Sequence, residues 1–179
     1  MNPKLVKFGS GLWELIKVVA ISLAIVLPVR YFVVQPFYVK GASMEPNFHD
    51  YQYLFIDEIS YRFNDPVRGQ VIVMRDPLEK SKYFIKRIIG LPGELIEVKD
   101  GGVYINSVQL EESAYLDQDV QTYAISEHAE VQLGDQEYYV MGDNRAASFD
   151  SRRFGPIARS EFVGRVWVRV WPFNYFKVY

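Results

Sequence analysis

The distribution of apolar residues changes near position 35 of this chain. Before that position lies one long apolar stretch, in which residues 18–29 carry no charge. Apolar side chains continue from there to Val34, and Arg30 is the interruption. A helix needs about 20 mainly apolar residues to cross a bilayer, and an arginine near its end can extend its charge to the headgroup region. We therefore interpret Trp13–Val34 as a single transmembrane helix.

After residue 35 the apolar residues occur in short runs that are rich in aromatic and β-branched side chains and are separated by turn residues. This pattern is typical of strands and predicts a mainly β fold, built as a barrel or as packed sheets. In the last run, valines alternate with arginine and tryptophan, so we expect the valines on one face of a strand. The turn Asp100-Gly101-Gly102 predicts a hairpin. The predicted strands are Tyr51–Ile56, Gln70–Met74, Tyr83–Ile89, Leu95–Val98, Val103–Ile105, Glu137–Met141 and Gly164–Trp171.

The stretch 111–136 is polar and acidic, with weak periodicity. Long irregular segments are uncommon inside a compact domain, so we expect a small cap to be inserted around residues 95–136. The chain then comprises residues 1–35, a cytoplasmic tip with a transmembrane anchor, and residues 36–179, a β domain that carries the cap.

Lysines precede the centre of the apolar stretch, at Lys4, Lys7 and Lys17. The positive-inside rule therefore predicts a single-pass protein of the plasma membrane, with its N-terminus in the cytoplasm and the β domain on the outer face. The lipid bilayer is then an expected partner. Two other interpretations of the stretch stay open: a cleaved secretory signal, although no small-x-small site closes it, and a buried core helix.

Composition and charge argue against several kinds of chemistry. The chain has no cysteine, which rules out disulfides, thiol catalysis and cysteine-ligated metals. Its two histidines, His49 and His128, lie in polar stretches typical of the surface and lack metal-ligand spacing. The net charge of −2 gives no indication of a nucleic-acid partner. We therefore expect no metal and no bound nucleic acid, and the serine–lysine chemistry described next needs no organic cofactor.

Candidate chemistry lies in two segments whose key residues are 43 positions apart. Ser43 stands beside a turn in Gly-Ala-Ser-Met-Glu-Pro. Lys86 stands in a predicted strand and is the first residue of the segment Lys-Arg-Ile-Ile-Gly-Leu-Pro-Gly-Glu. Phe84, Lys86 and Ile88 share one strand face. If that face is buried, desolvation lowers the pKa of the lysine, and a neutral lysine can activate a serine hydroxyl. The alternatives are an exposed edge-strand lysine and a serine that serves only the turn.

A third segment is a polar loop between the last two predicted strands. Asp143 and Arg145, and likewise Asp150 and Arg152, are spaced to pair and to pin the loop with bidentate contacts. Ser148 is placed to exchange a hydrogen bond with the lysine amine and so orient it. The alternative is a salt-bridged loop with a purely structural role.

Together these segments resemble the type I signal peptidases, the membrane-anchored Ser-Lys endopeptidases that remove signal peptides from exported preproteins. The match covers the anchor and then, in order, Ser-Met-x-Pro, Lys-Arg-x-x-Gly-x-Pro-Gly-Glu and Gly-Asp-Asn-Arg-x-x-Ser-x-Asp-Ser-Arg. It spans most of the chain, and the two longer motifs are highly specific together. The resemblance implies a peptidase domain in residues 36–179. It implies Ser43 as the nucleophile, Lys86 as the general base, Ser148 as the serine that orients the lysine, Met44 as a residue beside the substrate pocket, and Asp143, Arg145, Asp150 and Arg152 as residues that shape the loop behind the site.

One position departs from part of the family. Some members have a serine two positions before the nucleophile, whose hydroxyl completes the oxyanion hole, and here that position is Gly41. The resemblance implies the Ser43 amide as one oxyanion donor, and the second is then a backbone amide or a water. Loss of one such donor costs on the order of 10²–10³ in rate, so we expect a replacement.

The resemblance also implies a substrate, a signal peptide with small residues at the −1 and −3 positions that adds a strand beside the site. Two other functions stay open. One is a Ser-Lys peptidase dedicated to a single secreted or pilin-like protein, or to itself as in the Ser-Lys repressors; the transmembrane stretch and the absence of a DNA-binding helix pair disfavour the repressor. The other is a membrane-tethered β domain that has lost catalysis, which the intact Ser43 and Lys86 disfavour.

Overall fold

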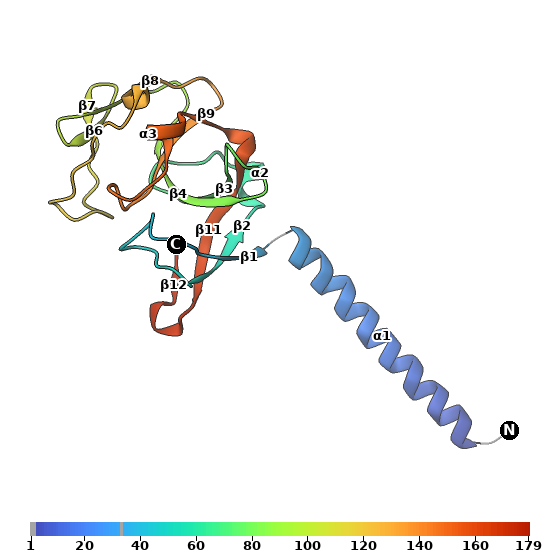
Figure 1. Cartoon of the computed structure of the whole chain (residues 1–179). Coiled ribbons are helices and arrows are strands. Elements are labelled where there is room, and N and C mark those ends of the chain that lie inside the picture. The colour runs from blue at the N-terminus through green and yellow to red at the C-terminus, as the bar shows by residue number, and fades with distance from the viewer. Residues whose placement is uncertain (1–2, 33) are drawn as a thin grey trace.

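The computed structural model describes the backbone of residues 3–32 and 34–179, and the side chains of residues 13–27 and 35–179. Figure 1 shows helix α1 (Pro3–Phe32) extending away from the rest of the chain, with one end next to strand β1 (Val34–Tyr38). Apolar side chains of α1 are exposed, for example Leu15 at 60% and Ile25 at 61%. Hydropathy along the described part of the chain identifies no helix that is both long enough and apolar enough to cross a membrane.

The sequence predicts a helix over Trp13–Val34, and the structure confirms helix as far as Phe32. The helix begins earlier than predicted, at Pro3, and Val34 belongs to β1 instead. Val33 lies outside the described residues. So do the side chains of residues 1–12 and 28–34, which include Arg30 and two of the three lysines on which the predicted orientation depends, Lys4 and Lys7.

The larger of two antiparallel sheets contains eight strands. Besides β1, its strands are β2 (Tyr53–Asp57), β3 (Val71–Arg75), β4 (Tyr83–Gly90), β9 (Glu137–Met141), β10 (Ile157–Ala158), β11 (Phe162–Trp171) and β12 (Lys177–Val178). They follow the order β1-β2-β11-β3-β4-β9-β10, with β12 paired to β11, and the sheet curls around the core (Figure 1). β1 contains Pro36, which has no N–H to donate, and it accordingly lies at the sheet edge, where proline is tolerated.

The smaller sheet has four strands in the order β7-β6-β5-β8. These are β5 (Leu95–Lys99), β6 (Gly102–Ile105), β7 (Val108–Gln109) and β8 (Glu130–Gln132). The predicted hairpin is confirmed, because β5 and β6 pair around Asp100 and Gly101, whose φ angles are 51° and 76°. The short helices are α2 (Ser60–Phe63), α3 (Ser151–Phe154) and the 3₁₀ turns η1 (Glu127–Ala129), η2 (Arg159–Glu161) and η3 (Phe173–Tyr175).

All seven predicted strands form, and their ends differ from the prediction by at most two residues. The sequence pattern misses β1, which contains a proline, and β7, β8, β10 and β12, which have only two or three residues each. Such short strands leave no alternation to detect.

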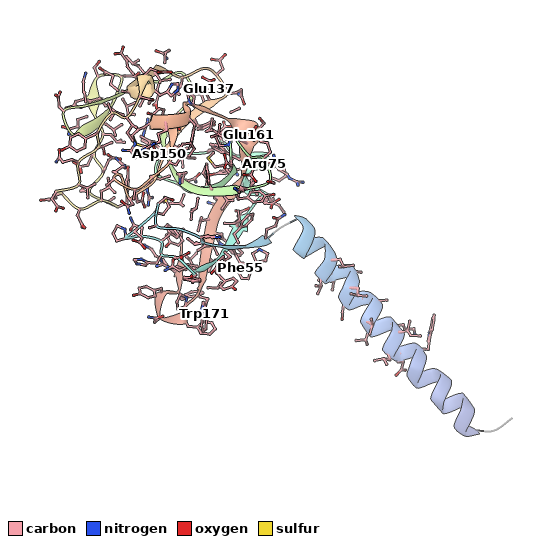
Figure 2. The ribbon with its side chains drawn as sticks, in the orientation of Figure 1. Phe55, Arg75, Glu137, Asp150, Glu161 and Trp171 are labelled. Atoms are coloured by element: carbon pink, nitrogen blue, oxygen red, sulfur yellow. The ribbon has the colours of Figure 1, made fainter. Side chains whose placement is uncertain are left out.

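The alternation predicted for β11 is interrupted by bulges between Val166 and Val168 and between Arg169 and Trp171. A bulge places two residues opposite one and turns the following side chains. Arg169 is consequently buried and donates to the carbonyls of Asn47 and Tyr175, whereas Trp171 at the end of β11 is exposed (Figure 2).

β4 contacts all three clusters of the hydrophobic core. Phe84 and Ile88 pack in one cluster, Ile85 packs against a second, and Ile89 belongs to the third. The shared face predicted for Phe84 and Ile88 is therefore confirmed. Residues of β4 thus pack against core on either side of Lys86, which is itself only 2% exposed.

Candidate active site

Ser43 lies in a tight turn that follows β1. Two backbone hydrogen bonds close the turn, from Glu45 N–H to the Ala42 carbonyl at 3.2 Å and from Phe48 N–H to the Met44 carbonyl at 2.9 Å. Met44 and Phe48 are 1% and 0% exposed, so their side chains fix the turn to the core. Ser43 itself is half-buried and faces a pocket.

Met44 and Gly41, the residues near Ser43 that were expected at the substrate pocket and the oxyanion hole, lie in different surroundings. Met44 packs with Val39 in the core, and it does not line the pocket beside Ser43. Gly41 has a φ of +96°, a left-handed conformation that favours glycine. Its amide donates to Asp50 Oδ1 at 3.0 Å, so this N–H is already engaged in the structure.

Lys86 reaches Ser43 from β4. In the described structure its Nζ makes two hydrogen bonds, to Ser43 Oγ at 2.9 Å and to the Ile85 carbonyl at 3.1 Å. The side chain is only 2% exposed. Burial lowers the pKa of Lys86 to about 8, although the more distant Asp150 and Asp143 oppose this shift. The amine is therefore partly neutral near neutral pH, and it lies within hydrogen-bonding distance of the hydroxyl that it would deprotonate.

Gly142 lets the polar loop approach Ser43 closely. A Cβ at this position would overlap both the Ser43 carbonyl oxygen and the Ser148 side chain, so the contact requires glycine. Ser148 is 5% exposed, and its Oγ completes no hydrogen bond of good geometry among the described residues, although it lies near enough to Asp150 to help lower the pKa of that carboxyl. The expected hydrogen bond from Ser148 to Lys86 is thus not formed in this structure, and its orienting role stays a prediction.

The expected pair between Asp150 and Arg152 is confirmed. Arg152 Nε and Nη2 donate to the two Asp150 oxygens at 2.9 and 2.8 Å, and Arg152 Nη2 also donates to the Arg145 carbonyl at 2.7 Å. Burial by itself raises the pKa of Asp150, but the Arg152 guanidinium, together with the Ser148 hydroxyl and the Gly142 amide, holds that pKa below its ordinary value. Asp150, labelled in Figure 2, also caps α3 and accepts the Gly142 N–H at 3.1 Å.

The expected pair between Asp143 and Arg145 is wrong. Asp143 instead accepts two hydrogen bonds from Arg87, from Nε at 2.8 Å and from Nη2 at 2.6 Å. Arg145 pairs with Glu112, donating from Nη1 at 3.0 Å and from Nη2 at 2.5 Å. A hydrogen bond from Arg145 N–H to the Asp143 carbonyl, 2.9 Å long, marks a tight turn that directs the two side chains to different partners.

The sequence gives some indication that Arg87 needs a buried partner, and it gives no indication that Glu112 pairs with Arg145. Arg87 follows Lys86 in the same strand, so its side chain must leave the opposite face, where only a buried carboxylate can compensate its charge. Glu112 comes from the irregular segment after β7, and its partner across 33 positions follows only from the fold.

Asn144 is a further residue that the sequence interpretation missed. Its backbone N–H donates to the Ser43 carbonyl at 3.0 Å, and its side-chain amide donates to the Ala42 carbonyl at 3.1 Å. It sits in the Gly-Asp-Asn-Arg motif, but an asparagine has no titratable group and so attracts no attention as a candidate catalyst.

A small pocket opens beside Ser43 and Lys86. Its volume is about 90 Å³, far below the roughly 300–1,000 Å³ of typical small-molecule sites. In the described structure β1 pairs on one side only, and β4 pairs with β9 only from Arg87 onward. Both strands therefore leave backbone groups free for an extended peptide. The pocket is lined by Phe37, Tyr38, Val39, Lys40, Ser43, Leu54, Val73, Tyr83, Phe84, Ile85 and Lys86.

The chain is similar in sequence to known proteins over most of its length. Residues 12–171 match the family model described as signal peptidase, peptidase S26. The chain is 37% identical to a probable signal peptidase I-2 from Synechocystis sp. over 164 residues, which cover 89% of this chain and 73% of the relative. It is 32% identical to signal peptidase I from Bacillus licheniformis over 171 residues, which cover 92% of this chain and 91% of the relative. A crystal structure of a signal peptidase I from Enterococcus faecalis V583 matches 57% of this chain and 97% of that chain, with 31% identity and a TM-score of 0.48.

Proposed function

We propose a catalytic mechanism for this chain, which belongs to the signal peptidase family, peptidase S26. As a member of that family it is a serine endopeptidase that cleaves signal peptides from preproteins. The proposal assigns the chemistry to Ser43 as nucleophile and Lys86 as general base. The observation that carries it is the 2.9 Å contact between Lys86 Nζ and Ser43 Oγ in a place where the lysine is buried.

Neutral Lys86 takes the Ser43 proton while the hydroxyl oxygen attacks the scissile carbonyl. The tetrahedral intermediate collapses when the lysine ammonium returns that proton to the leaving amine, which leaves an acyl-enzyme on Ser43. Water, deprotonated by the same lysine, then releases the signal peptide. A buried lysine suits this cycle because its lowered pKa of about 8 lets it both accept and return a proton near neutral pH.

The Ser43 backbone amide is the proposed first donor to the oxyanion. Gly41 brings no hydroxyl, and in this structure its amide is bound to Asp50, so Gly41 serves the oxyanion directly only if that bond opens. A water is the other proposed second donor. Ser148 is proposed to orient the Lys86 amine, because its buried Oγ borders the same site and completes no hydrogen bond of good geometry among the described residues.

The substrate is proposed to have small residues, usually alanine, at its −1 and −3 positions. An extended peptide between the free edges of β1 and β4 would direct alternate side chains toward the pocket, and about 90 Å³ has room for small ones only.

We further propose that α1 is a single-pass anchor in the plasma membrane, with its N-terminus in the cytoplasm and the peptidase domain on the outer face. The exposed apolar side chains of α1 and the lysines before them in the sequence support this placement. The chain then divides into residues 1–35 and 36–179, with a cap inserted around 95–136. A protease added outside intact cells should digest the peptidase domain, and a protease confined to the cytoplasm should not.

The test uses a preprotein with an Ala-x-Ala site and sequences the new N-terminus of the product. Wild type should cut after the second alanine, and Ser43→Ala and Lys86→Ala should not. Ser81 and Lys82 are exposed residues just before β4, so Ser81→Ala and Lys82→Ala are matched controls that should cut like wild type. Cleavage that survives Lys86→Ala would assign the base elsewhere. Cleavage of one preprotein but of no unrelated ones would favour a dedicated peptidase.

A further inference from the structure

Asn144 holds the turn of the nucleophile with two different groups. Its backbone N–H donates to the Ser43 carbonyl at 3.0 Å, and its Nδ2 donates to the Ala42 carbonyl at 3.1 Å. Its own side chain is fixed as well, because Oδ1 accepts the Ala147 N–H at 3.2 Å. The side chain therefore connects the polar loop to the peptide bond between Ala42 and Ser43.

That peptide bond carries the proposed oxyanion donor. The cis bonds among the described residues are Glu45–Pro46 and Trp171–Pro172, so the Ala42–Ser43 bond is trans. In a trans peptide the carbonyl and the N–H lie in one plane and point in opposite directions. When Asn144 holds the Ala42 carbonyl toward the polar loop, the Ser43 N–H must therefore point away from that loop, on the side where Ser43 faces its pocket.

Hydrogen bonds to the carbonyl also strengthen this donor. The Ala42 oxygen accepts from Glu45 N–H at 3.2 Å in addition to Asn144 Nδ2. Electron density drawn toward the carbonyl oxygen leaves the N–H of the same peptide more positive, which is the usual cooperativity of hydrogen-bonded amides. In the described structure the Ser43 N–H has no acceptor among the backbone and side-chain hydrogen bonds, so it is free for the substrate.

We propose that Asn144 is a positioning residue for the oxyanion hole, which aims and polarises the Ser43 N–H through the Ala42 carbonyl. This inference rests on the proposed function, because it takes Ser43 as the nucleophile and its amide as an oxyanion donor. Asn144 does not touch the substrate in this account. It acts on a donor that matters most when negative charge develops in the transition state.

The expected signature is a loss of kcat with little change in KM. Removal of an oxyanion donor costs on the order of 10²–10³ in rate, and a donor that remains but is poorly aimed should cost less, on the order of 10- to 100-fold. Asn144→Ala should show this loss of kcat, with KM within about twofold of wild type. The acidic limb of its pH profile should not move, because no titratable group has changed.

Two variants separate the donor from general damage to the loop. Asn144→Asp keeps an oxygen that can accept the Ala147 N–H but cannot donate to the Ala42 carbonyl, so it should lose at least as much kcat as Asn144→Ala. Asn64 is an exposed asparagine that follows α2, and its Nδ2 donates to the Ser60 carbonyl at 3.2 Å, so it binds a backbone carbonyl as Asn144 does but not one in the turn of Ser43. Asn64→Ala is therefore the matched control and should keep wild-type kcat. Activities are compared per folded molecule, with the folded fraction taken from thermal unfolding.

The decisive readout compares two peptides that end in Ala-x-Ala. A peptide aldehyde adds to Ser43 Oγ and turns its carbonyl into an oxyanion, whereas the peptide carboxamide binds without reacting. Asn144→Ala should weaken the aldehyde by the same factor as it lowers kcat/KM and leave the carboxamide unchanged. Equal weakening of both peptides, or a raised KM with unchanged kcat, would overturn the proposal. A wild-type enzyme that ignores the aldehyde, or a Ser43→Ala variant that still cleaves, would instead refute the assignment of Ser43.

Discussion

Lys86 and Arg87 are neighbours on β4 and are both buried, at 2% and 8% exposed, but their surroundings differ completely. Arg87 leaves one face of the strand and meets Asp143 in a bidentate ion pair, and it also donates to the Gly69 carbonyl at 2.7 Å. Lys86 leaves the other face, and its hydrogen bonds go to a hydroxyl and a carbonyl. One cation is compensated by a buried carboxylate, and the other is not.

This difference determines which of the two residues can react. A guanidinium paired with a carboxylate keeps its charge and holds the loop of Asp143 in place. A buried ammonium without a carboxylate partner is unstable, and the lysine relieves the cost by giving up its proton. Exposed Lys82 shows the opposite behaviour, because its hydrogen bond with Glu79 raises its pKa. The proposed reactivity of Lys86 therefore depends on its amine being hydrogen-bonded to a hydroxyl and a carbonyl and not to a carboxylate.

The largest expected effect follows from making the two neighbours alike. Lys86→Arg keeps a long cationic side chain but cannot supply a neutral base, because arginine does not deprotonate in proteins. We expect kcat/KM for a preprotein to fall by about 10⁴-fold or more, as it does when a catalytic base is removed. The conservative exchange at the next position, Arg87→Lys, should retain most activity per folded molecule. Comparable activity in both variants would mean that Lys86 is not the base.

A smaller effect, now on stability, follows from removing the partner of Arg87. Asp143→Ala leaves a buried guanidinium uncompensated, and we expect the free energy of unfolding in urea to fall by about 3–5 kcal/mol. The double variant Arg87→Met/Asp143→Ala should recover part of this loss, because it no longer buries a charge. If the double variant is as unstable as Asp143→Ala, the loss comes from packing and not from the unpaired charge.

The complementary prediction is that Lys86, the proposed base, costs stability. Its folded-state pKa of about 8 lies below the ordinary value of 10.5, so between these values the folded state binds fewer protons than the unfolded state and stability rises with pH. Below about pH 8 the full cost applies. Lys86→Met should therefore stabilise the protein near pH 7 by on the order of 3 kcal/mol, and the gain should shrink as the pH approaches 10.5. A gain that does not depend on pH would point to packing instead.

The smallest effect concerns a pair that is not buried. Lys80 Nζ and Glu161 Oε1 lie 2.6 Å apart, but their side chains are 56% and 22% exposed. Solvent screens such pairs, so Glu161→Gln should change the free energy of unfolding by less than about 1 kcal/mol. A loss as large as that of Asp143→Ala would show that burial does not set the strength of these ion pairs.

The strands, and Ser43 and Lys86 as a candidate pair, could be predicted from sequence because each has a local pattern, and the structure brings the two side chains to 2.9 Å. Alternation within β4 indicates which residues share the face of Lys86, and the motif around Ser43 supplies a turn. The burial of Lys86 could not be predicted from this pattern, since an edge strand shows the same alternation. It depends on β3, which pairs beside β4 and makes it an inner strand, and on the turn of Ser43, whose hydroxyl lies 2.9 Å from Lys86 Nζ.

The partners of the charged residues could not be predicted, because they are set by contacts between distant segments. Arg87 meets Asp143 across 56 positions, and Arg145 meets Glu112 across 33. Sequence spacing instead favoured a pair between Asp143 and Arg145, which a single tight turn prevents. The bulges that bury Arg169 were missed for a similar reason, since a bulge depends on the register with a neighbouring strand.

If a buried, neutral Lys86 activates Ser43, kcat/KM must depend on pH through the protonation of this lysine. When kcat/KM for a preprotein is measured from about pH 6 to about pH 10, we expect it to rise about tenfold per pH unit and to level off near the lysine pKa of about 8. Asp143→Ala should move this limb to lower pH, because that carboxylate raises the lysine pKa. A flat profile, or a limb that levels off only near the ordinary lysine value of 10.5, would contradict the account.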